Sequence, residues 1–135
     1  MADGSGGCMT SGLILFGHGS RVPGWDAPFL RLRDRVARHR PDWRIGLAWL
    51  EFMSPGLEDA VSVLAGCGCD RICIVPLFLG PGAHFLRDYP VMLARLRERF
   101  PRIDLTDLST PGDSEIVLAG LAEWILTGVD GQDDA

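Results

Sequence analysis

The amino-acid sequence predicts a single α/β domain, in which helices flank a four-stranded parallel sheet. Two observations support this class. Four short apolar segments alternate with four segments of helical periodicity, without a long break between them. Such alternation is typical of parallel strands joined by right-handed crossovers. The length of 135 residues fits one domain, and we see no internal repeat or domain boundary.

The first half of the sequence predicts two strands and two helices. The strands are expected at residues 13–16 and 44–50. Between them, residues 26–39 carry apolar side chains on one side and arginines on the other, which predicts an amphipathic helix. The next helix is expected to open at Ser54-Pro55, because serine caps helices and proline suits their first turn.

The second half repeats the alternation. Residues 71–77 are almost continuously apolar, which is typical of a strand buried on both faces. A loop rich in glycine and proline follows at residues 80–84, and residues 88–90 lead into the third helix. The fourth strand is expected at residues 103–108, and residues 113–114 cap the last helix.

The two ends differ in composition from the middle of the chain. We expect residues 1–12 to form a flexible segment, residues 13–127 to form the domain, and residues 128–135 to form an acidic disordered tail. The start of the chain lacks the charge and apolar pattern of a signal peptide. No apolar run approaches the ~20 residues that span a bilayer. With four cysteines but no export signal, we expect a reduced, cytoplasmic protein.

The charge balance limits the choice of partners. A net charge of −5 argues against nucleic acid or an anionic membrane surface. All 13 cationic residues are arginines, so lysine Schiff bases and the P-loop lysine are excluded. A carboxylate-rich ligand would have to be held by arginine, whose planar guanidinium suits carboxylates.

Three polar residues follow three of the predicted strands. His18 comes directly after the first strand, Glu51 ends the second, and His84 lies in the loop after the third. Ligands of parallel α/β sheets bind at the carboxyl ends of the strands, so we expect these residues to converge. Two imidazoles and a carboxylate suit Fe, Co, Ni or Zn. Taken singly, each histidine could be an ordinary polar residue, and Glu51 could simply accept hydrogen bonds from the next loop.

Other candidate residues have simpler explanations. His39 stands between two arginines near a helix end and is expected to be a surface residue. The spacing of Cys67, Cys69 and Cys73 matches no standard zinc pair, which favours a structural role. The glycines beside His18 could cradle a phosphate, but neither the dinucleotide-binding nor the P-loop pattern is present.

Three motifs follow the predicted strands in order. They are Phe16-Gly17-His18-Gly19-Ser20-Arg21, then Leu50-Glu51-Phe52 with Ser54-Pro55, and then Pro76-Leu77-Phe78-Leu79 leading into Gly82-Ala83-His84 with Asp88 and Pro90. Together they resemble the class II sirohydrochlorin chelatases of the cobalamin and siroheme pathways. The resemblance covers roughly residues 13–127 and implies their chelatase-like α/β fold. Gly56 and Tyr89 stand where a small hydroxyl residue and an aliphatic residue are expected.

The resemblance implies an enzyme that inserts Co²⁺ or Fe²⁺ into sirohydrochlorin. It implies that His18 and His84 hold the metal, which is a substrate and not a permanent cofactor. Glu51 is the best-placed acidic helper. Longer members of the family contain two such domains that face each other across the substrate. This chain has one, so the resemblance implies a homodimer.

The chemistry of this substrate suggests further roles. Sirohydrochlorin carries many carboxylates, and Arg21 and Arg87, with Ser20, are the expected binding residues. Metallation releases two pyrrole protons, so a base must lie beside the macrocycle. His18 or His84 can accept them, because imidazole changes charge near neutral pH. An adjacent carboxylate could accept protons or orient a histidine.

Three alternatives remain open at this stage. The metal could be Ni²⁺, or the substrate a related tetrapyrrole, because nitrogen and oxygen ligands select weakly among these ions. The protein could carry a metal or a tetrapyrrole without catalysing insertion. It could also be a flavodoxin-like phosphate binder, whose phosphate affinity would not change in His18→Ala.

Overall fold

A parallel sheet of four strands forms the centre of the molecule, in the order β2-β1-β3-β4. The computed structural model describes residues 10–133. The strands are β1 (Thr10–Gly17), β2 (Arg44–Trp49), β3 (Cys69–Pro76) and β4 (Asp104–Asp107). Strand β1 pairs with both β2 and β3. The predicted fold class is therefore confirmed, and the topological switch point lies beside β1.

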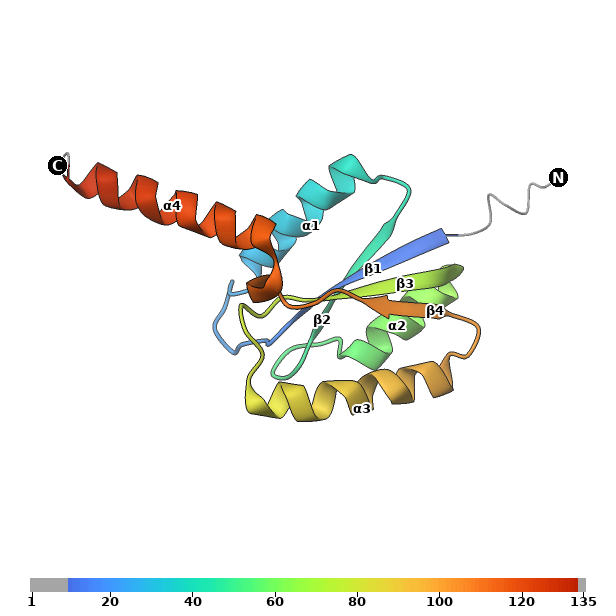
Figure 1. Cartoon of the computed structure of the whole chain (residues 1–135). Helices are drawn as coiled ribbons and strands as arrows, with labels where there is room; N and C mark the ends of the chain where they lie inside the picture. Colours follow the sequence, from blue (N-terminus) through green and yellow to red (C-terminus); the bar gives the residue numbers. More distant parts are fainter. Residues whose placement is uncertain (1–9, 134–135) are drawn as a thin grey trace.

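The helices lie on both faces of the sheet. They are α1 (Ala27–His39), α2 (Leu57–Gly66), α3 (Ala83–Arg99) and α4 (Glu115–Asp133), with a short 3-10 turn, η2 (Pro111–Asp113), before the last. Figure 1 shows α2 and α3 on one face and α1 on the other, while α4 projects away from the body. Within residues 10–133, no helix has the length and apolar content that crossing a membrane requires.

Two helices begin at other residues than the sequence predicts. Helix α2 starts at Leu57, because the carbonyl of Pro55 accepts a hydrogen bond from Trp49 N at 3.0 Å and Gly56 is extended. The Ser54–Pro55 peptide bond is cis. Helix α3 already starts at Ala83, so His84 lies in its first turn and not in the preceding loop.

Helix α3 continues through Pro90, although proline gives up one helical hydrogen bond. The buried side chains of Phe85, Tyr89, Leu93 and Leu96 lie three or four residues apart on both sides of it. Their burial against the sheet stabilises the helix across this position.

The ends of the described region also differ from the expected boundaries. Strand β1 begins at Thr10, three residues before the predicted start. Helix α4 continues to Asp133, through most of the segment for which the sequence predicts an acidic tail. Residues 1–9 and 134–135 lie outside the described range.

The main core fills the space between the sheet and the helix pair α2 and α3. Phe16, Ile14 and Ile74 are fully buried there, together with the apolar sides of both helices. The Phe16 ring stacks on Tyr89, with 6.2 Å between ring centroids, and also packs against Phe85. Loss of such a ring costs about 3–5 kcal/mol of stability. This packing fixes the start of α3 against the end of β1.

Tyr89 joins this core to the end of β4. Its side chain is buried, and its hydroxyl donates a hydrogen bond to Asp107 Oδ2 at 3.1 Å. Burial raises the pKa of the Tyr89 phenol well above its ordinary value of 10.0, and the negative charge of Asp107 raises it further. The phenol therefore stays neutral in the folded protein when an exposed tyrosine would ionise.

We predict that Tyr89 does not ionise near pH 10.0 while the protein is folded. Tyr89 is the only tyrosine in the sequence, so tyrosinate absorbance reports on it alone. In urea the same titration should follow the ordinary value. Because the folded pKa is raised, stability should be full below about pH 10 and fall as pH rises beyond it. Ordinary titration in the folded state would contradict the buried hydrogen bond.

Candidate functional site

Backbone hydrogen bonds tie three loops together at the carboxyl end of the sheet. Leu50 N donates to the Gly17 carbonyl at 2.9 Å, and Glu51 N donates to the His18 carbonyl at 3.0 Å. On the other side of β1, Leu77 N donates to the Phe16 carbonyl at 2.8 Å. These bonds continue the sheet pairing beyond the strands, so the loop backbones are held in fixed positions.

Gly19 allows the first two loops to approach each other. Its φ is +93°, a left-handed conformation that favours glycine. A Cβ atom at this position would overlap the backbone carbonyl of Glu51. A larger residue would therefore force the loop after β1 away from the loop after β2. The glycine next to the histidine is explained by this close approach.

One pocket of about 410 Å³ lies at this edge. It contains all three residues that the sequence predicts to converge, His18, Glu51 and His84. They come from the loop after β1, the loop after β2 and the first turn of α3. The remaining lining residues are Leu50, Phe85, Asp88, Tyr89 and Met92. The pocket thus combines an apolar wall with two imidazoles and two carboxylates.

His18 is hydrogen-bonded to Glu51, with 2.9 Å between Nε2 and Oε1. An ionised carboxylate only accepts hydrogen bonds, so Nε2 carries the proton. In a neutral ring, the lone pair then lies on Nδ1. A carboxylate in this position fixes the tautomer and the orientation of the ring and makes the imidazole a better ligand. Both side chains remain about half exposed.

In His84 the two ring nitrogens have the opposite roles, with Nδ1 as the hydrogen-bond acceptor. Nη2 of Arg87 lies 2.8 Å from His84 Nδ1. A guanidinium only donates hydrogen bonds, so Nδ1 is the acceptor and the proton of a neutral ring lies on Nε2. Arg87 also donates through Nε to Asp88 Oδ1 at 3.1 Å. The lone pair of His84 is therefore occupied by Arg87, while that of His18 is not bonded to Glu51.

The ligands for a cation are not gathered in advance. Within residues 10–133, no three His, Cys, Asp or Glu side chains lie close enough to hold a metal ion together. Cys67, Cys69 and Cys73 are free, and burial raises the pKa of the Cys69 thiol. Holding a metal through both imidazoles and a carboxylate together would therefore require local side-chain movement.

The other predicted residues lie beside the pocket. The guanidinium of Arg21 stacks over the Phe52 ring, 4.5 Å from its centroid. The hydroxyl of Ser20 accepts a hydrogen bond from Val22 N at 3.1 Å, which stabilises the turn of this loop. Neither Arg21 nor Ser20 lines the pocket with the two histidines, whereas Arg87 contacts His84 directly.

Two aromatic residues were not singled out from the sequence. Phe52 has a φ of 69° and is 51% exposed, and its ring lies 6.5 Å from that of His18. Phe78 meets the same imidazole edge-on at 6.4 Å. An exposed aromatic residue in a left-handed conformation is costly, and such residues gather at functional sites. Phe52 and Phe78 both belong to the motifs that resemble the chelatase family. Membership in these motifs is the signal by which the sequence could have singled them out.

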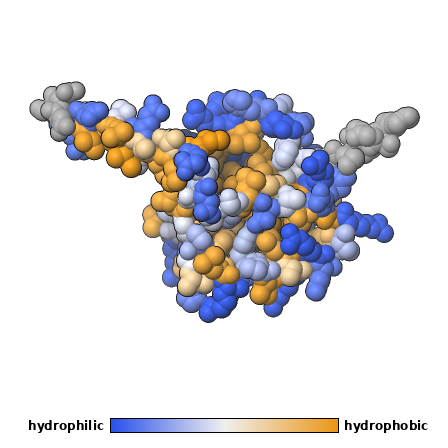
Figure 2. All heavy atoms as spheres, in the orientation of Figure 1, coloured by the Kyte–Doolittle hydropathy of each residue, from blue (hydrophilic) through white to orange (hydrophobic). Residues whose placement is uncertain are grey.

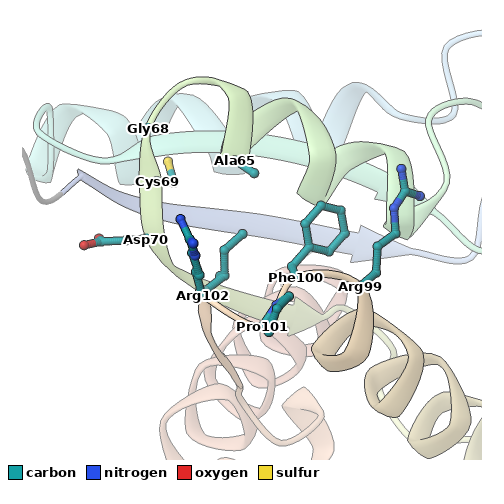
Figure 3. Close-up of a pocket in the computed structure, with 9 residues that line it drawn as sticks. Ala65, Gly68, Cys69, Asp70, Arg99, Phe100, Pro101 and Arg102 are labelled. Atoms are coloured by element: carbon teal, nitrogen blue, oxygen red, sulfur yellow. The ribbon is translucent and has the colours of Figure 1, made fainter.

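A second hollow of about 430 Å³ lies at the opposite end of β3 (Figure 3). In this view Arg102 rises toward Cys69, while Asp70 points away. Arg99, which also lines it, forms an ion pair with Glu58. No imidazole contributes to this hollow. The pocket at the carboxyl edge is therefore the better candidate site.

The CbiX family profile matches residues 12–126. A sirohydrochlorin cobaltochelatase of Methanosarcina acetivorans is 32% identical over 83 residues, which are 62% of this chain and 64% of that protein. The matched segment therefore spans less than two thirds of this relative.

Two solved structures are similar in fold. A CbiX protein from Marinobacter aquaeolei has a TM-score of 0.76 and 23% identity, over 89% of this chain and 98% of that chain. The sirohydrochlorin chelatase SirB from Bacillus subtilis subspecies spizizenii, solved in complex with cobalt, has a TM-score of 0.69 and 27% identity. That match covers 79% of this chain and 46% of the SirB chain.

We predict that Gly19→Ala destabilises the protein more than Gly24→Ala does. Both glycines have positive φ, but a Cβ at Gly24 meets nothing within 4 Å. Gly24→Ala should cost about 1–2 kcal/mol from backbone strain alone. Gly19→Ala should cost clearly more, because the two loops must separate. Urea unfolding of both variants measures the difference, and equal losses would show that the close approach is unimportant.

Proposed function

The chain belongs to the CbiX family, and from this premise we propose that it inserts a divalent metal ion, Co²⁺ or Fe²⁺, into sirohydrochlorin. The observation that carries the proposal is one pocket that both His18 and His84 line, from segments far apart in the sequence. Imidazole nitrogen binds both ions well, and the pocket has an apolar wall for a macrocycle. The relative from Methanosarcina acetivorans bears the name of this activity.

In this proposal His18 receives the metal first. Its Nδ1 carries the lone pair, while Glu51 holds the ring through Nε2. Coordination to a neutral imidazole replaces part of the hydration shell of the incoming ion. The exposure of both side chains leaves the aqueous ion a direct approach. Glu51 raises the basicity of the ring without occupying the ligand atom.

His84 becomes available when the tetrapyrrole arrives. Arg87 holds Nδ1 of His84 in the empty pocket. A substrate carboxylate is a stronger partner for a guanidinium than a neutral imidazole, because both members of the pair are charged. Binding of the macrocycle would therefore draw Arg87 away and free His84. This exchange would couple substrate binding to metal transfer.

The pyrrole protons leave as the metal enters the ring. After His18 has released the metal, its Nδ1 can accept one of the two protons, and Nδ1 of His84, once it is free of Arg87, can accept the other. The resulting His18 imidazolium is stabilised by the ion pair with Glu51.

Arg21 and Ser20 follow His18 in the same loop, and in this proposal they bind substrate carboxylates. Phe52 offers an exposed ring next to them for contact with the macrocycle.

We further propose that two copies of the chain form the substrate cleft. His18 and Glu51 are about half exposed, so one copy covers only one side of a bound macrocycle. One copy also matches only 46% of the SirB chain, leaving room for a second domain of similar size. We place the homodimer in the cytoplasm, in cobalamin or siroheme biosynthesis.

We predict that the chain accelerates metal insertion and that both histidines are required. Anaerobic absorption spectroscopy of sirohydrochlorin with Co²⁺, Fe²⁺ or Ni²⁺ measures the rate. His18→Ala and His84→Ala should each lose at least about 100-fold, as expected when a group that handles protons is removed. His39→Ala is the matched control, because this exposed histidine bonds to its own helix at Arg35 O.

Rates equal to the uncatalysed reaction with every metal would overturn the proposed enzyme. Stoichiometric binding of tetrapyrrole or metal without acceleration would indicate a carrier protein. Full activity in both site variants would place the reaction elsewhere on the molecule.

We predict opposite effects of Arg87→Ala on the two substrates. Removal of the guanidinium frees His84, so Co²⁺ affinity of the protein alone should rise by roughly tenfold, the worth of one charge-assisted hydrogen bond. Affinity for sirohydrochlorin should fall. Titration calorimetry measures both, and Arg95→Ala, on the same helix, is the control. Unchanged metal affinity in Arg87→Ala would contradict the competition between Arg87 and the metal.

A further inference from the structure

The imidazole of His18 has aromatic neighbours as well as its hydrogen bond to Glu51. The Phe78 ring lies 6.4 Å from the imidazole, and the two ring planes are almost perpendicular, at 81°. The Phe52 ring lies 6.5 Å away on a plane tilted by 36°. Edge-on pairs at such distances attract each other, because the positive edge of one ring meets the negative face of the other. The aromatic contacts therefore also act on the orientation of this imidazole.

The pairing of β1 with β3 brings Phe78 beside His18. Phe16 and Pro76 are register partners in the two parallel strands. His18 and Phe78 follow these partners by two residues each, and side chains two residues apart in an extended chain point to the same side. The hydrogen bond from Leu77 N to the Phe16 carbonyl continues the pairing beyond the strands. The contact between the two rings thus follows from the register of the sheet.

Phe78 is held more firmly than Phe52. It is partly buried and packs against the main core. Its ring meets Phe16 edge-on at 5.9 Å and Phe85 at 4.7 Å. The Phe52 side chain is 51% exposed, and the guanidinium of Arg21 stacks on it. Phe78 is therefore fixed by the core, whereas Phe52 lies at the surface.

The place of Phe78 separates it from the apolar residues of the surface. Figure 2 shows hydrophobic atoms at several places on the visible face of the body, and scattered apolar residues of this kind need no functional explanation. Phe78 packs inward instead, and it does not line the pocket that contains His18 and His84. An effect of Phe78 on a ligand in this pocket must therefore act through a neighbouring side chain.

One hydrogen bond does not fix the plane of an imidazole ring. The bond to Glu51 sets the position of Nε2 of His18, but the ring can still rock about that atom. A metal ion binds along the lone pair of Nδ1, which lies in the ring plane, so rocking changes the direction in which the ion is held. The edge-on contact with Phe78 opposes this motion, because rocking would break it.

We propose that Phe78 is a positioning residue for His18, which holds the plane of the imidazole so that the Nδ1 lone pair points into the pocket. Glu51 holds one nitrogen of the ring, and Phe78 supplies the second constraint. The inference rests on the proposed function, in which Nδ1 receives the metal. Phe85 directly follows His84 in the first turn of α3, so the packing of Phe78 on Phe85 holds the first imidazole relative to the segment that carries the second.

Cobalt binding to the protein alone tests the positioning role. Phe78→Leu keeps an apolar side chain but removes the ring. It should weaken Co²⁺ binding by about tenfold or more, the usual loss when a group that orients a metal ligand is removed. The visible absorption spectrum of bound Co²⁺ should also change, because it reports the geometry of the ligands. Phe78→Met, which fills the space with a flexible side chain, should act in the same way, whereas Phe78→Tyr keeps the ring and should bind Co²⁺ as the wild type does.

Phe100→Leu is the matched control. Phe100 packs against the same core, but it follows the far end of α3 and lines the hollow at the opposite end of β3. Urea unfolding measures the stability that each variant loses. Co²⁺ binding should stay unchanged in Phe100→Leu. Equal weakening of Co²⁺ binding in Phe78→Leu and Phe100→Leu, or binding as in the wild type in Phe78→Leu and Phe78→Met, would overturn the positioning role.

Insertion assays separate this inference from the proposed function. Phe78→Leu should lower kcat by about tenfold or more, and leave KM for sirohydrochlorin within about twofold, because Phe78 does not line the pocket. A wild type without insertion activity, together with weaker Co²⁺ binding in Phe78→Leu, would overturn the enzyme and support the positioning role. An active wild type, with Phe78→Leu equal to Phe100→Leu in every assay, would overturn the positioning role alone.

Discussion

The close contact between the loops after β1 and β2 is the constraint on which the site depends. The carbonyl of His18 accepts a hydrogen bond from Glu51 N, and Gly19 leaves room for the Glu51 carbonyl. The two side chains then meet at 2.9 Å. A residue with a Cβ atom at position 19 would separate them. The orientation of the first imidazole is thus set by backbone packing, and not by the side chains alone.

Much of this arrangement could be predicted from the sequence. The apolar periodicity predicted the alternation of strands and helices. Because ligands of parallel sheets bind at the carboxyl ends of the strands, the sequence also predicted that His18, Glu51 and His84 lie at one edge. The start of α3 could not be predicted, because Pro90 indicated a boundary where burial of Phe85 and Leu93 maintains a helix. Hydrogen-bond partners of the imidazoles depend on side-chain positions that periodicity does not reveal.

The two faces of the sheet differ in how completely they are covered. One face is packed against α2 and α3 in a continuous core, whereas α1 covers only part of the other. The sequence predicted a last helix capped by residues 113–114, but nothing in the sequence indicates that this helix leaves the body. That direction follows from the tight turn at Gly112. Within the described residues, the layer on the α1 side of the sheet is therefore incomplete.

The central claim is that both imidazoles bind the incoming cation at the carboxyl edge. Anomalous diffraction at the cobalt absorption edge, from crystals grown with Co²⁺, tests it most directly. The account predicts a cobalt peak about 2 Å from His18 Nδ1, with His84 turned away from Arg87 toward the ion. Cobalt held only at Cys67 or at surface carboxylates, with His18 still bonded to Glu51 and no metal beside it, would contradict the claim.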